Sequence, residues 1–310
     1  MTAHTEMTVQ GEVELLPKLG DTRATPTWHE APVVGNRHIA DRYWALSLHA
    51  PTIAADVQPG QFVMLTAARR HQATPVLPRP MAVYDVNLAD GLLHILYGVV
   101  GAGTTQLTSF SPGEEMLCVG PLGRAFDLVP DTRHLVLLGR GIGICSLTLL
   151  AKQAKLIGVP VTAISSSRSP DSAIGSDLYR AHGVHVREVY DSDGSSHVQR
   201  LYDDLERTMP QEQSTLIAVC GSRRLLQMAG NLARSRGARI QVSLEAHMAC
   251  GLGYCHGCAT GERSATDESP LICQDGPAFS YIVQETTTSS RFQASVSPSR
   301  SSPQSRSATG

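Results

Sequence analysis

Apolar and polar residues alternate in short runs over the first part of the chain, and proline and glycine separate the runs. Alternation with a period of two between turn residues is typical of β-strands. The close spacing of the turns predicts a small antiparallel β-barrel over residues 27–130. The runs are RYWALSLHAP, GQFVMLTA, PMAVYDV, GLLHILYGVV and EEMLCVGPLG.

The pattern changes near Asp131, where apolar strand-like runs begin to alternate with helical periodicity. Alternating strands and helices predict a Rossmann-like domain over residues 131–240, with a parallel sheet covered by helices on both faces. The expected strands are HLVLLG, VPVTAISSS, VHVREVYD and STLIAVCG. The expected helices are ICSLTLLAKQAKLIG, a stretch near 171–182, HVQRLYDDLERTM and RRLLQMAGNLARSRG.

Three further segments complete the expected organisation. Residues 1–26 are polar and without pattern, which predicts a loose leader. Residues 241–282 carry most of the cysteines and are expected to form a small C-terminal module. Residues 283–310 are rich in serine and poor in apolar residues, which predicts a disordered tail.

Composition narrows the class of protein. The 310 residues carry a formal net charge of −2, which argues against nucleic-acid or membrane-surface binding. No run is apolar over the roughly 18–20 residues that a membrane span needs. The first twenty residues lack the basic and apolar regions of a secretory signal, so a cytoplasmic protein is expected.

Four of the seven cysteines gather near the end of the chain. Cys250-x4-Cys255-x2-Cys258 is followed after fourteen residues by Cys273, which is the spacing of plant-type [2Fe–2S] ligands. Interspersed glycines would let backbone N–H groups approach the sulfurs. Structural zinc is the main alternative, because zinc also takes four thiolates.

The remaining cysteines and one histidine are assigned no metal. Cys118, Cys145 and Cys220 lie in apolar runs and are expected to be small buried side chains. His256 stands between two of the proposed ligands, but four cysteines already complete the set, so it is expected at the surface.

Three stretches have the character of phosphate-binding sites. Arg79 precedes a strand-like run, and a guanidinium there can pair with a pyrophosphate. The segment GAGTT (101–105) is a glycine turn before a helix-like run. LVLLGRGIGICSL (135–147) reads as strand, glycine turn and helix, and VCGSRR (219–224) ends another strand at the same edge of the sheet.

The order of these parts resembles the ferredoxin–NADP reductase superfamily, and within it the electron-transfer subunits of NAD-dependent dihydroorotate dehydrogenases. The resemblance covers about residues 30–282, and its most specific segment is SLEAHMACGLGYCHGCAT followed by LICQDGPAF. It implies a barrel that binds FAD, an NAD(P)H-binding domain and a [2Fe–2S] module. The flavin residues would be Arg79, Pro80, Met81, Ala82, Leu96, Tyr97, Gly98, Gly103 and Thr104.

The resemblance also implies the other site residues and the flow of electrons. The nucleotide residues would be Gly139, Gly141, Gly143, Cys220 and Gly221, and the cluster ligands Cys250, Cys255, Cys258 and Cys273. NADH would reduce FAD by hydride transfer, and single electrons would pass through the cluster to an FMN-containing catalytic subunit. Such a protein is a hetero-oligomeric oxidoreductase subunit of pyrimidine biosynthesis. No acid–base pair or nucleophile is required, and none is assigned.

Three positions depart from the family pattern. Ala82 stands where a serine hydroxyl is usual, Arg140 interrupts the glycine turn, and Ser222 replaces a proline. The side chain of Arg140 is expected near the nucleotide phosphates, where it would favour a phosphorylated ribose or crowd the site. All three departures lie where hydride enters, so the FAD and cluster sites are expected to be kept.

These departures leave other functions open. The chain is also compatible with a divergent paralogue that serves another redox enzyme in specialised metabolism. A self-contained NAD(P)H oxidoreductase that reduces a small acceptor, and a zinc-stabilised regulatory protein, are further alternatives.

Overall fold

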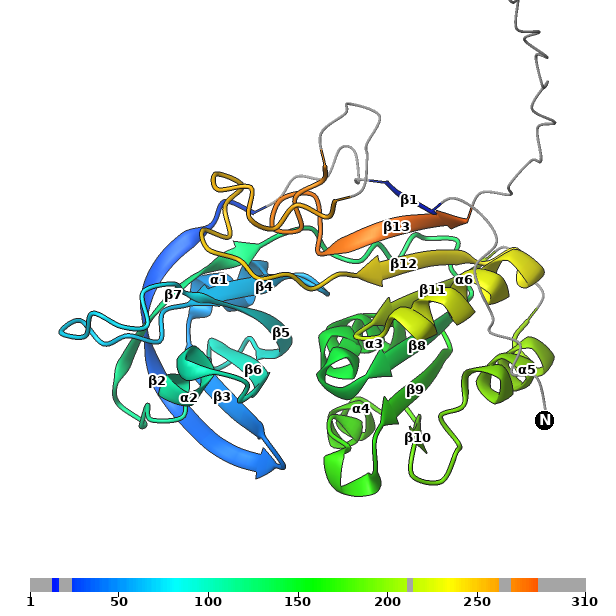
Figure 1. Ribbon diagram of the computed structural model, residues 1–310, viewed down its shortest axis with the longest axis horizontal. Coiled ribbons are helices and arrows are strands. Elements are labelled where there is room, and N and C mark those ends of the chain that lie inside the picture. The colour runs from blue at the N-terminus through cyan, green and yellow to red at the C-terminus, as the bar shows by residue number, and fades with distance from the viewer. Residues whose placement is uncertain (1–12, 17–23, 211–213, 262–268, 284–310) are drawn as a thin grey trace, which may run out of the picture.

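The protein consists of a barrel and a helix-covered sheet that lie side by side, with the cysteine segment running between them (Figure 1). This computed structural model describes residues 13–16, 24–210, 214–261 and 269–283. The architecture confirms the prediction of an antiparallel barrel joined to an α/β domain. No helix in the described ranges is long and apolar enough to cross a membrane.

Six antiparallel strands close the barrel in the order β2-β3-β6-β5-β4-β7. Alternate residues point inward, as Leu46 and Leu48 on β3 and Leu93 and Ile95 on β6 show by being at most 1% exposed. The long strand β2 was not predicted, because only two of its fourteen residues are buried and its apolar alternation is weak. The elements are β2 (Thr27–Ala40), β3 (Tyr43–His49), α1 (Pro51–Asp56), β4 (Phe62–Leu65), β5 (Arg79–Asn87), β6 (Leu92–Gly98), α2 (Ala102–Leu107) and β7 (Glu115–Leu122).

The second body is a seven-stranded sheet in the order β1-β13-β12-β11-β8-β9-β10. The strands from β8 to β12 are parallel to one another, whereas β13 and β1 are antiparallel additions at one edge. The sheet is therefore mixed rather than wholly parallel. Its strands are β1 (Val13–Leu16), β8 (His134–Arg140), β9 (Val161–Ser167), β10 (Val186–Tyr190), β11 (Thr215–Cys220), β12 (Arg239–Ser243) and β13 (Ala278–Val283).

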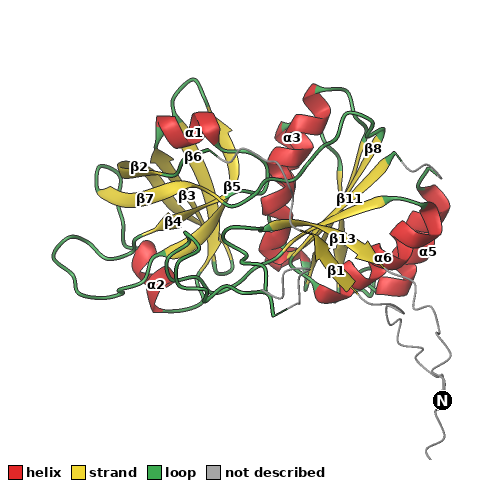
Figure 2. Ribbon diagram, turned by 90° about the horizontal axis from the view of Figure 1, so that it is seen from above, coloured by secondary structure: helices red, strands yellow, loops and turns green. Residues whose placement is uncertain are grey.

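Helices cover both faces of this sheet, with α3 on the side of the barrel and α5 and α6 on the far side (Figure 2). Residues of β8 alternate accordingly: Leu135 and Leu137 pack with α3 and α4, and Val136 and Leu138 pack with α5 and α6. The expected helix after the glycine turn begins as a 3-10 helix, η1, and becomes α-helical only at Thr148. The helices are η1 (Gly141–Leu147), α3 (Thr148–Leu156), η2 (Pro170–Ser172), α4 (Ser176–Ala181), α5 (Val198–Thr208) and α6 (Arg223–Arg236).

Two segments that were expected to lie outside the α/β domain are connected to its seven-stranded sheet. Val13–Leu16, in the expected leader, forms β1 and pairs with β13. The cysteine segment lies between β12 and β13, so it is a long insertion between two neighbouring strands. The rest of the leader before residue 24, and the tail after residue 283, lie outside the described residues.

A small polar network joins the barrel to the helical layer. The Asp85 carboxylate on β5 lies 2.8 Å from Lys152 Nζ on α3. His182 Nε2, at the end of α4, lies 3.3 Å from the other carboxylate oxygen, without the alignment of a hydrogen bond. Lys152 also donates to the carbonyl of Val86 at 3.3 Å. One barrel carboxylate thus faces two cationic or titratable groups of the neighbouring layer.

We expect Asp85→Asn to lower the free energy of unfolding by about 1 kcal/mol, because a half-buried Lys152 loses its counter-charge. For a chain of this size the melting temperature should fall by about 2–4 °C. Asp177→Asn is the matched control, since Asp177 pairs with Arg180 on the surface and its side chain is 95% exposed. Calorimetry of both variants checks the prediction, and equal melting temperatures would contradict it.

Candidate functional site

The structure brings the four predicted cluster ligands together. Cys250, Cys255 and Cys258 lie in the loop that follows β12, and Cys273 lies shortly before β13. Cys258 and Cys273 are buried, each 3% exposed, whereas Cys250 is half-buried and Cys255 is exposed. The backbone N–H of Cys273 donates to Cys258 Sγ at 3.4 Å, and that of Leu252 donates to Cys250 Sγ at 3.4 Å.

The electrostatic surroundings of the thiols suit metal binding. Burial opposes ionisation of Cys250, but backbone N–H groups of Leu252, Cys255 and Tyr254 donate to its sulfur, and its pKa falls to about 7. Burial and the neighbouring Cys258 raise the pKa of Cys273 to about 12. A thiol in such a position ionises when a cation compensates its charge, and iron ions supply that charge.

The four sulfurs interact in two pairs. Cys250 interacts with Cys255, and Cys258 interacts with Cys273. A [2Fe–2S] cluster shares four thiolates between two irons. Within the described ranges, no group of three or more His, Cys, Asp or Glu side chains is arranged around one ion position.

Glycines shape the loop that carries these ligands. Gly251 has a φ of +70° and Gly253 a φ of +88°, a region that other residues seldom adopt. A Cβ at Gly253 would lie 2.3 Å from Gln274 Oε1, so the loop lies tightly against the segment of the fourth cysteine. His256 is exposed, as expected, with a φ of 54°.

The cysteine loop rests directly on the barrel. A Cβ at Gly251 would lie 2.6 Å from Met64 Cγ on β4 and 3.4 Å from Leu122 Cδ1 on β7. Met64 in turn pairs with Pro80 on β5, the strand of the expected flavin motif. A single strand, β4, therefore separates the cysteine loop from that motif.

The two expected flavin segments also meet. Arg79 begins β5, and its guanidinium lies against Gly103 so closely that a Cβ there would be 2.1 Å from Arg79 Nε. Thr104 Oγ1 accepts hydrogen bonds from the N–H groups of Val100 at 2.9 Å and Gly101 at 3.2 Å. Arg79 and the glycine turn thus form one continuous polar surface at the N-terminal end of α2.

The other expected flavin residues divide into two groups. Met81 and Tyr97 are buried in the barrel core, where the Tyr97 hydroxyl donates to Asn36 Oδ1 at 3.0 Å. Their side chains therefore belong to the barrel core. Pro80, Ala82 and Gly98 are only partly buried, and Leu96 packs with residues of the neighbouring sheet.

The glycine turn of the second body is built for close packing. A Cβ at Gly139 would lie 2.4 Å from Ile144 Cα, and one at Gly143 would lie 2.7 Å from the carbonyl oxygen of Cys220. Burial raises the pKa of the Cys220 thiol to about 12, so this residue is a neutral, inert side chain. Gly141 and Gly221 instead line an open cleft.

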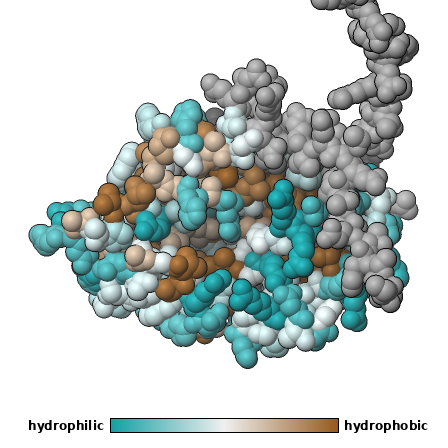
Figure 3. Space-filling model, in the orientation of Figure 1, coloured by the Kyte–Doolittle hydropathy of each residue, from teal (hydrophilic) through white to brown (hydrophobic). Residues whose placement is uncertain are grey.

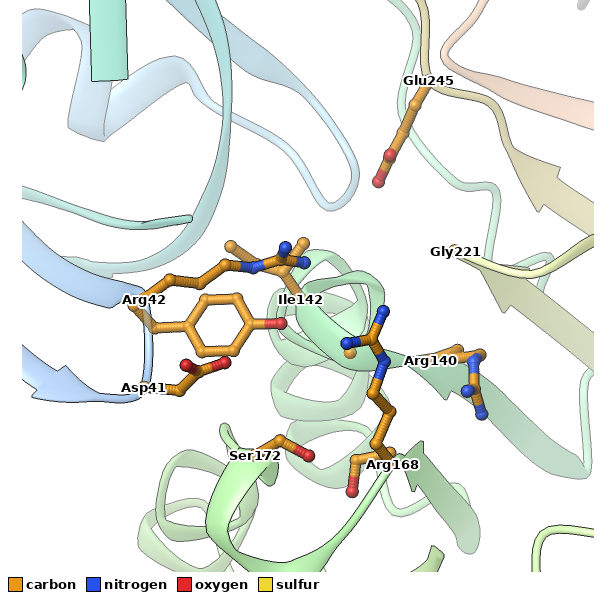
Figure 4. Close-up of a pocket in the computed structure, with 11 residues that line it drawn as sticks. Asp41, Arg42, Arg140, Ile142, Arg168, Ser172, Gly221 and Glu245 are labelled. Atoms are coloured by element: carbon orange, nitrogen blue, oxygen red, sulfur yellow. The ribbon is translucent and has the colours of Figure 1, made fainter. Parts of the chain in front are cut away.

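This cleft lies between the barrel and the carboxyl ends of the sheet strands (Figure 4). Its volume is about 290 Å³. Open α/β sheets bind their ligands at this edge. The lining residues are Asp41, Arg42, Tyr43, Arg140, Gly141, Ile142, Ser167, Arg168, Ser172, Gly221 and Glu245.

Sequence reasoning missed several of these residues. Arg42 lies in the turn between β2 and β3, and Tyr43 begins β3; both belong to a predicted strand-like run but were not predicted to face a site. Arg168 directly follows β9, and its place after a predicted strand was an available signal. Glu245 follows β12, and burial raises the pKa of its carboxyl group.

Arg140 lines the cleft, and its guanidinium is held by an ion pair. Its guanidinium turns away from the cleft (Figure 4) and donates to both carboxylate oxygens of Asp191, at 3.1 and 2.6 Å. It also donates to Ser166 Oγ at 2.8 Å. The guanidinium of Arg140 is thus bound by Asp191, a residue just beyond β10.

Apolar side chains on the face of Figure 3 gather in small groups over the barrel and beside the cysteine segment. Tyr254 is 85% exposed in the cysteine loop, and Trp28 is 61% exposed on β2. Both line a hollow of about 600 Å³ that also contains Cys273. Exposed aromatic residues of this kind are enriched at protein–protein interfaces.

Comparison with known proteins agrees with this geometry. Residues 245–282 match the family model of the iron-sulfur cluster binding domain of dihydroorotate dehydrogenase B. A protein of Listeria innocua, the dihydroorotate dehydrogenase B (NAD(+)) electron transfer subunit, is 32% identical over 253 residues. That match covers 81% of this chain and 96% of the relative. The subunit of Geobacillus thermodenitrificans is 32% identical over 251 residues, which cover 80% of this chain and 94% of the relative.

Among solved structures, an NADH-dependent reduced ferredoxin-NADP oxidoreductase has the same fold, with a TM-score of 0.69 and 24% sequence identity. The superposition covers 85% of this chain and 90% of that one. The matches cover nearly the whole length of these sequence relatives, and the family model covers the cysteine segment. The chain therefore belongs to the family of dihydroorotate dehydrogenase B electron transfer subunits.

Proposed function

We propose that the chain passes electrons from a reduced pyridine nucleotide, through FAD and a [2Fe–2S] cluster, to a partner enzyme. One observation carries this proposal: Gly251 of the cysteine loop packs on Met64 of β4, next to the strand that begins with Arg79. The two expected redox sites are thus neighbours within one rigid core. The relatives, named electron transfer subunits, support the same function.

The proposed cofactor sites follow from the residues described above. Cys250, Cys255, Cys258 and Cys273 would hold the cluster, with backbone N–H groups donating to the sulfurs. Residues of the two flavin segments, Arg79–Ala82 and 96–104, would hold FAD. FAD can take up a hydride and release single electrons, and a [2Fe–2S] cluster carries one electron at a time.

The protein's own residues position the cofactors. The Arg79 guanidinium provides a fixed fork for a pyrophosphate, and Thr104 stabilises the turn beneath it. Ala82 supplies no hydroxyl to the flavin site, so side-chain hydrogen bonding to a ring nitrogen cannot come from this position. Catalysis by this chain rests on positioning, and no catalytic acid, base or nucleophile is assigned.

The proposed partner is an FMN-containing catalytic subunit in a hetero-oligomer, as in dihydroorotate oxidation for pyrimidine biosynthesis. Exposed Cys255 and the aromatic residues Tyr254 and Trp28 form the face nearest the cluster site. Another redox enzyme is the second candidate partner, and the departure at Ala82 favours it. Because thiolate ligands require reduced cysteines, we place the chain in the cytoplasm.

The proposal is tested with the full chain purified without oxygen. Its visible spectrum should show a flavin band near 450 nm together with broad iron–sulfur absorbance, and NADH or NADPH should bleach both. Addition of a dihydroorotate dehydrogenase B catalytic subunit with orotate should restore the oxidised spectrum. A colourless protein, or a coloured protein that neither nucleotide reduces, would contradict the proposal.

A further inference from the structure

The fourth cysteine of the candidate cluster site lies in the middle of a tight turn. The turn runs from Leu271 to Asp275, with Cys273 at its centre. The backbone N–H of Asp275 donates to the carbonyl of Leu271 at 2.7 Å, and the N–H of Leu271 donates to Asp275 Oδ2 at 2.7 Å. The N–H of Gln274 also donates to the Leu271 carbonyl, at 2.9 Å. Asp275 therefore closes the turn with its backbone and its side chain together.

This turn holds Cys273 against the other ligand segments. The N–H of Ile272 donates to the carbonyl of Cys258 at 3.1 Å, and the N–H of Cys273 donates to Cys258 Sγ at 3.4 Å. From the cysteine loop, the N–H of Gly253 donates to Cys273 Sγ. Both N–H···S bonds involve Cys273, so both depend on where the turn places it. Hydrogen bonds to the sulfurs help to set the reduction potential of an iron–sulfur cluster.

Both ends of the turn are fixed by contacts outside it. At its start, Leu271 forms an antiparallel β-bridge with Ala259. Just after it, the carbonyl of Gly276 accepts a hydrogen bond from the N–H of Arg124 at 2.5 Å. Between these anchors, the path of the chain depends on the bonds within the turn. Loss of the carboxylate that closes the turn should therefore displace the central cysteine and leave the surrounding sheet in place.

The Asp275 carboxylate has no other partner among the residues that the structure describes. Within those ranges, no Lys, Arg or His nitrogen lies within 4.0 Å of it, and its hydrogen bond is the one from Leu271. A negative charge beside a cluster opposes reduction, because reduction adds an electron. An asparagine oxygen could close the same turn without that charge. The contacts of Asp275 thus indicate a role for its oxygen rather than for its charge.

From this geometry we propose that Asp275 is a positioning residue for the cluster, because it closes the turn that carries Cys273. The inference rests on the proposed function, since it concerns the ligands of the same [2Fe–2S] cluster. Asp275 acts through the turn and is not itself a ligand, because four thiolates already complete the set. The cluster site requires a hydrogen-bond acceptor at this position and does not require a negative charge.

Two substitutions separate the acceptor from the charge. Asp275→Asn keeps an acceptor oxygen at the same distance from the backbone and removes the charge, whereas Asp275→Glu keeps the charge and moves the oxygens one methylene further out. The full-length holoproteins are purified without oxygen, reduced with dithionite and measured by electron paramagnetic resonance. Asp275→Asn should keep the g-values of the native chain, and Asp275→Glu should change them or lose the signal. The half-life of the cluster in air should fall about tenfold in Asp275→Glu and stay within about twofold in Asp275→Asn.

Asp275→Ala measures the size of the effect. This variant lacks the charge, as Asp275→Asn does, so a comparison of the two isolates the missing oxygen. At a given potential, the ratio of reduced to oxidised cluster should be about tenfold lower in Asp275→Ala than in Asp275→Asn. For one electron this corresponds to a midpoint potential about 59 mV more negative. The reason is that weakened N–H···S bonds stabilise the added electron less.

His256→Ala is the control, because His256 is exposed between two of the ligands and should affect neither the g-values nor the potential. Altered g-values in Asp275→Asn, native g-values in Asp275→Glu, or equal potentials in Asp275→Asn and Asp275→Ala would each overturn the inference. The FAD content of each variant reports on folding. If Asp275→Ala loses FAD, the comparison of Asp275→Asn with Asp275→Glu still decides.

The outcome is separable from that of the proposed function. A native chain without iron and acid-labile sulfide would contradict the proposed function. A native chain that carries the cluster, with variants that show no difference between acceptor and charge, would contradict only the positioning role of Asp275.

Discussion

Replacing Cys255 by alanine should abolish the cluster while leaving the fold and the flavin site intact. Cys255 is exposed, so its side chain contributes little to the core, in contrast to Cys258 and Cys273. Its loss removes one of four thiolates and leaves one iron with a single protein ligand. Iron and acid-labile sulfide should fall from about two of each per chain to near zero. Electron transfer to a one-electron acceptor protein should fall by at least about a hundredfold.

The matched control is Tyr254→Ala, at the neighbouring exposed position of the same loop. This variant keeps the backbone N–H that donates to Cys250 and all four thiols, so its iron content should equal that of the native chain. Metal analysis, sulfide assay and visible spectra of both variants provide the measurement. Full iron content in Cys255→Ala would remove Cys255 from the ligand set, and zinc without sulfide in the native protein would favour the structural zinc site instead.

The strands that were predicted share a clear local signal. Leu46 and Leu48 alternate with Ser47 and His49, and Leu93 and Ile95 flank His94, so the period of two is visible without knowledge of the partners. β2 lacks that signal, because only two of its fourteen residues are buried and its pairing with β3 and β7 stabilises it. The antiparallel edge formed by β13 and β1 was equally hidden. It depends on pairing between segments more than 260 residues apart, such as Val13 with Val283.

In the candidate site, too, features encoded within one short segment could be predicted, whereas contacts between distant segments could not. The four candidate ligand cysteines could be predicted because their chemistry and their spacing are both encoded within one short segment. The contact of Gly251 with Met64 was not predicted, because it depends on how the cysteine loop packs against β4 in the folded protein. The ion pair of Arg140 was not predicted for a similar reason. The long side chain of Arg140 forms an ion pair with the carboxylate of Asp191, which lies beyond β10. The sequence of the glycine turn does not identify that partner.

Replacing Gly103 by alanine adds a single methyl group, and we expect this change to cause a large loss of FAD binding. The added Cβ would lie 2.1 Å from Nε, 2.2 Å from Nη2 and 2.3 Å from Cζ of Arg79, which is far inside van der Waals contact. The guanidinium would have to leave its place beside the glycine turn, and a bidentate bond to a pyrophosphate would be lost with it. A charge-assisted pair of this kind contributes about 3 kcal/mol, so FAD affinity should fall at least about a hundredfold.

Gly101→Ala is the control that separates this effect from a general disturbance of the turn. Gly101 lies two positions away, its φ of −176° is extended backbone that alanine adopts, and a Cβ there meets nothing within 4 Å. FAD content after purification and the dissociation constant from titration of the apoprotein should therefore stay close to native values in Gly101→Ala. Because the obstructing atoms belong to the long side chain of Arg79, Arg79→Ala should bind FAD as weakly as Gly103→Ala, and the double variant should be no weaker than either. Additive losses in the double variant would show that Gly103 acts on FAD independently of Arg79, and would refute the coupling of the two flavin segments.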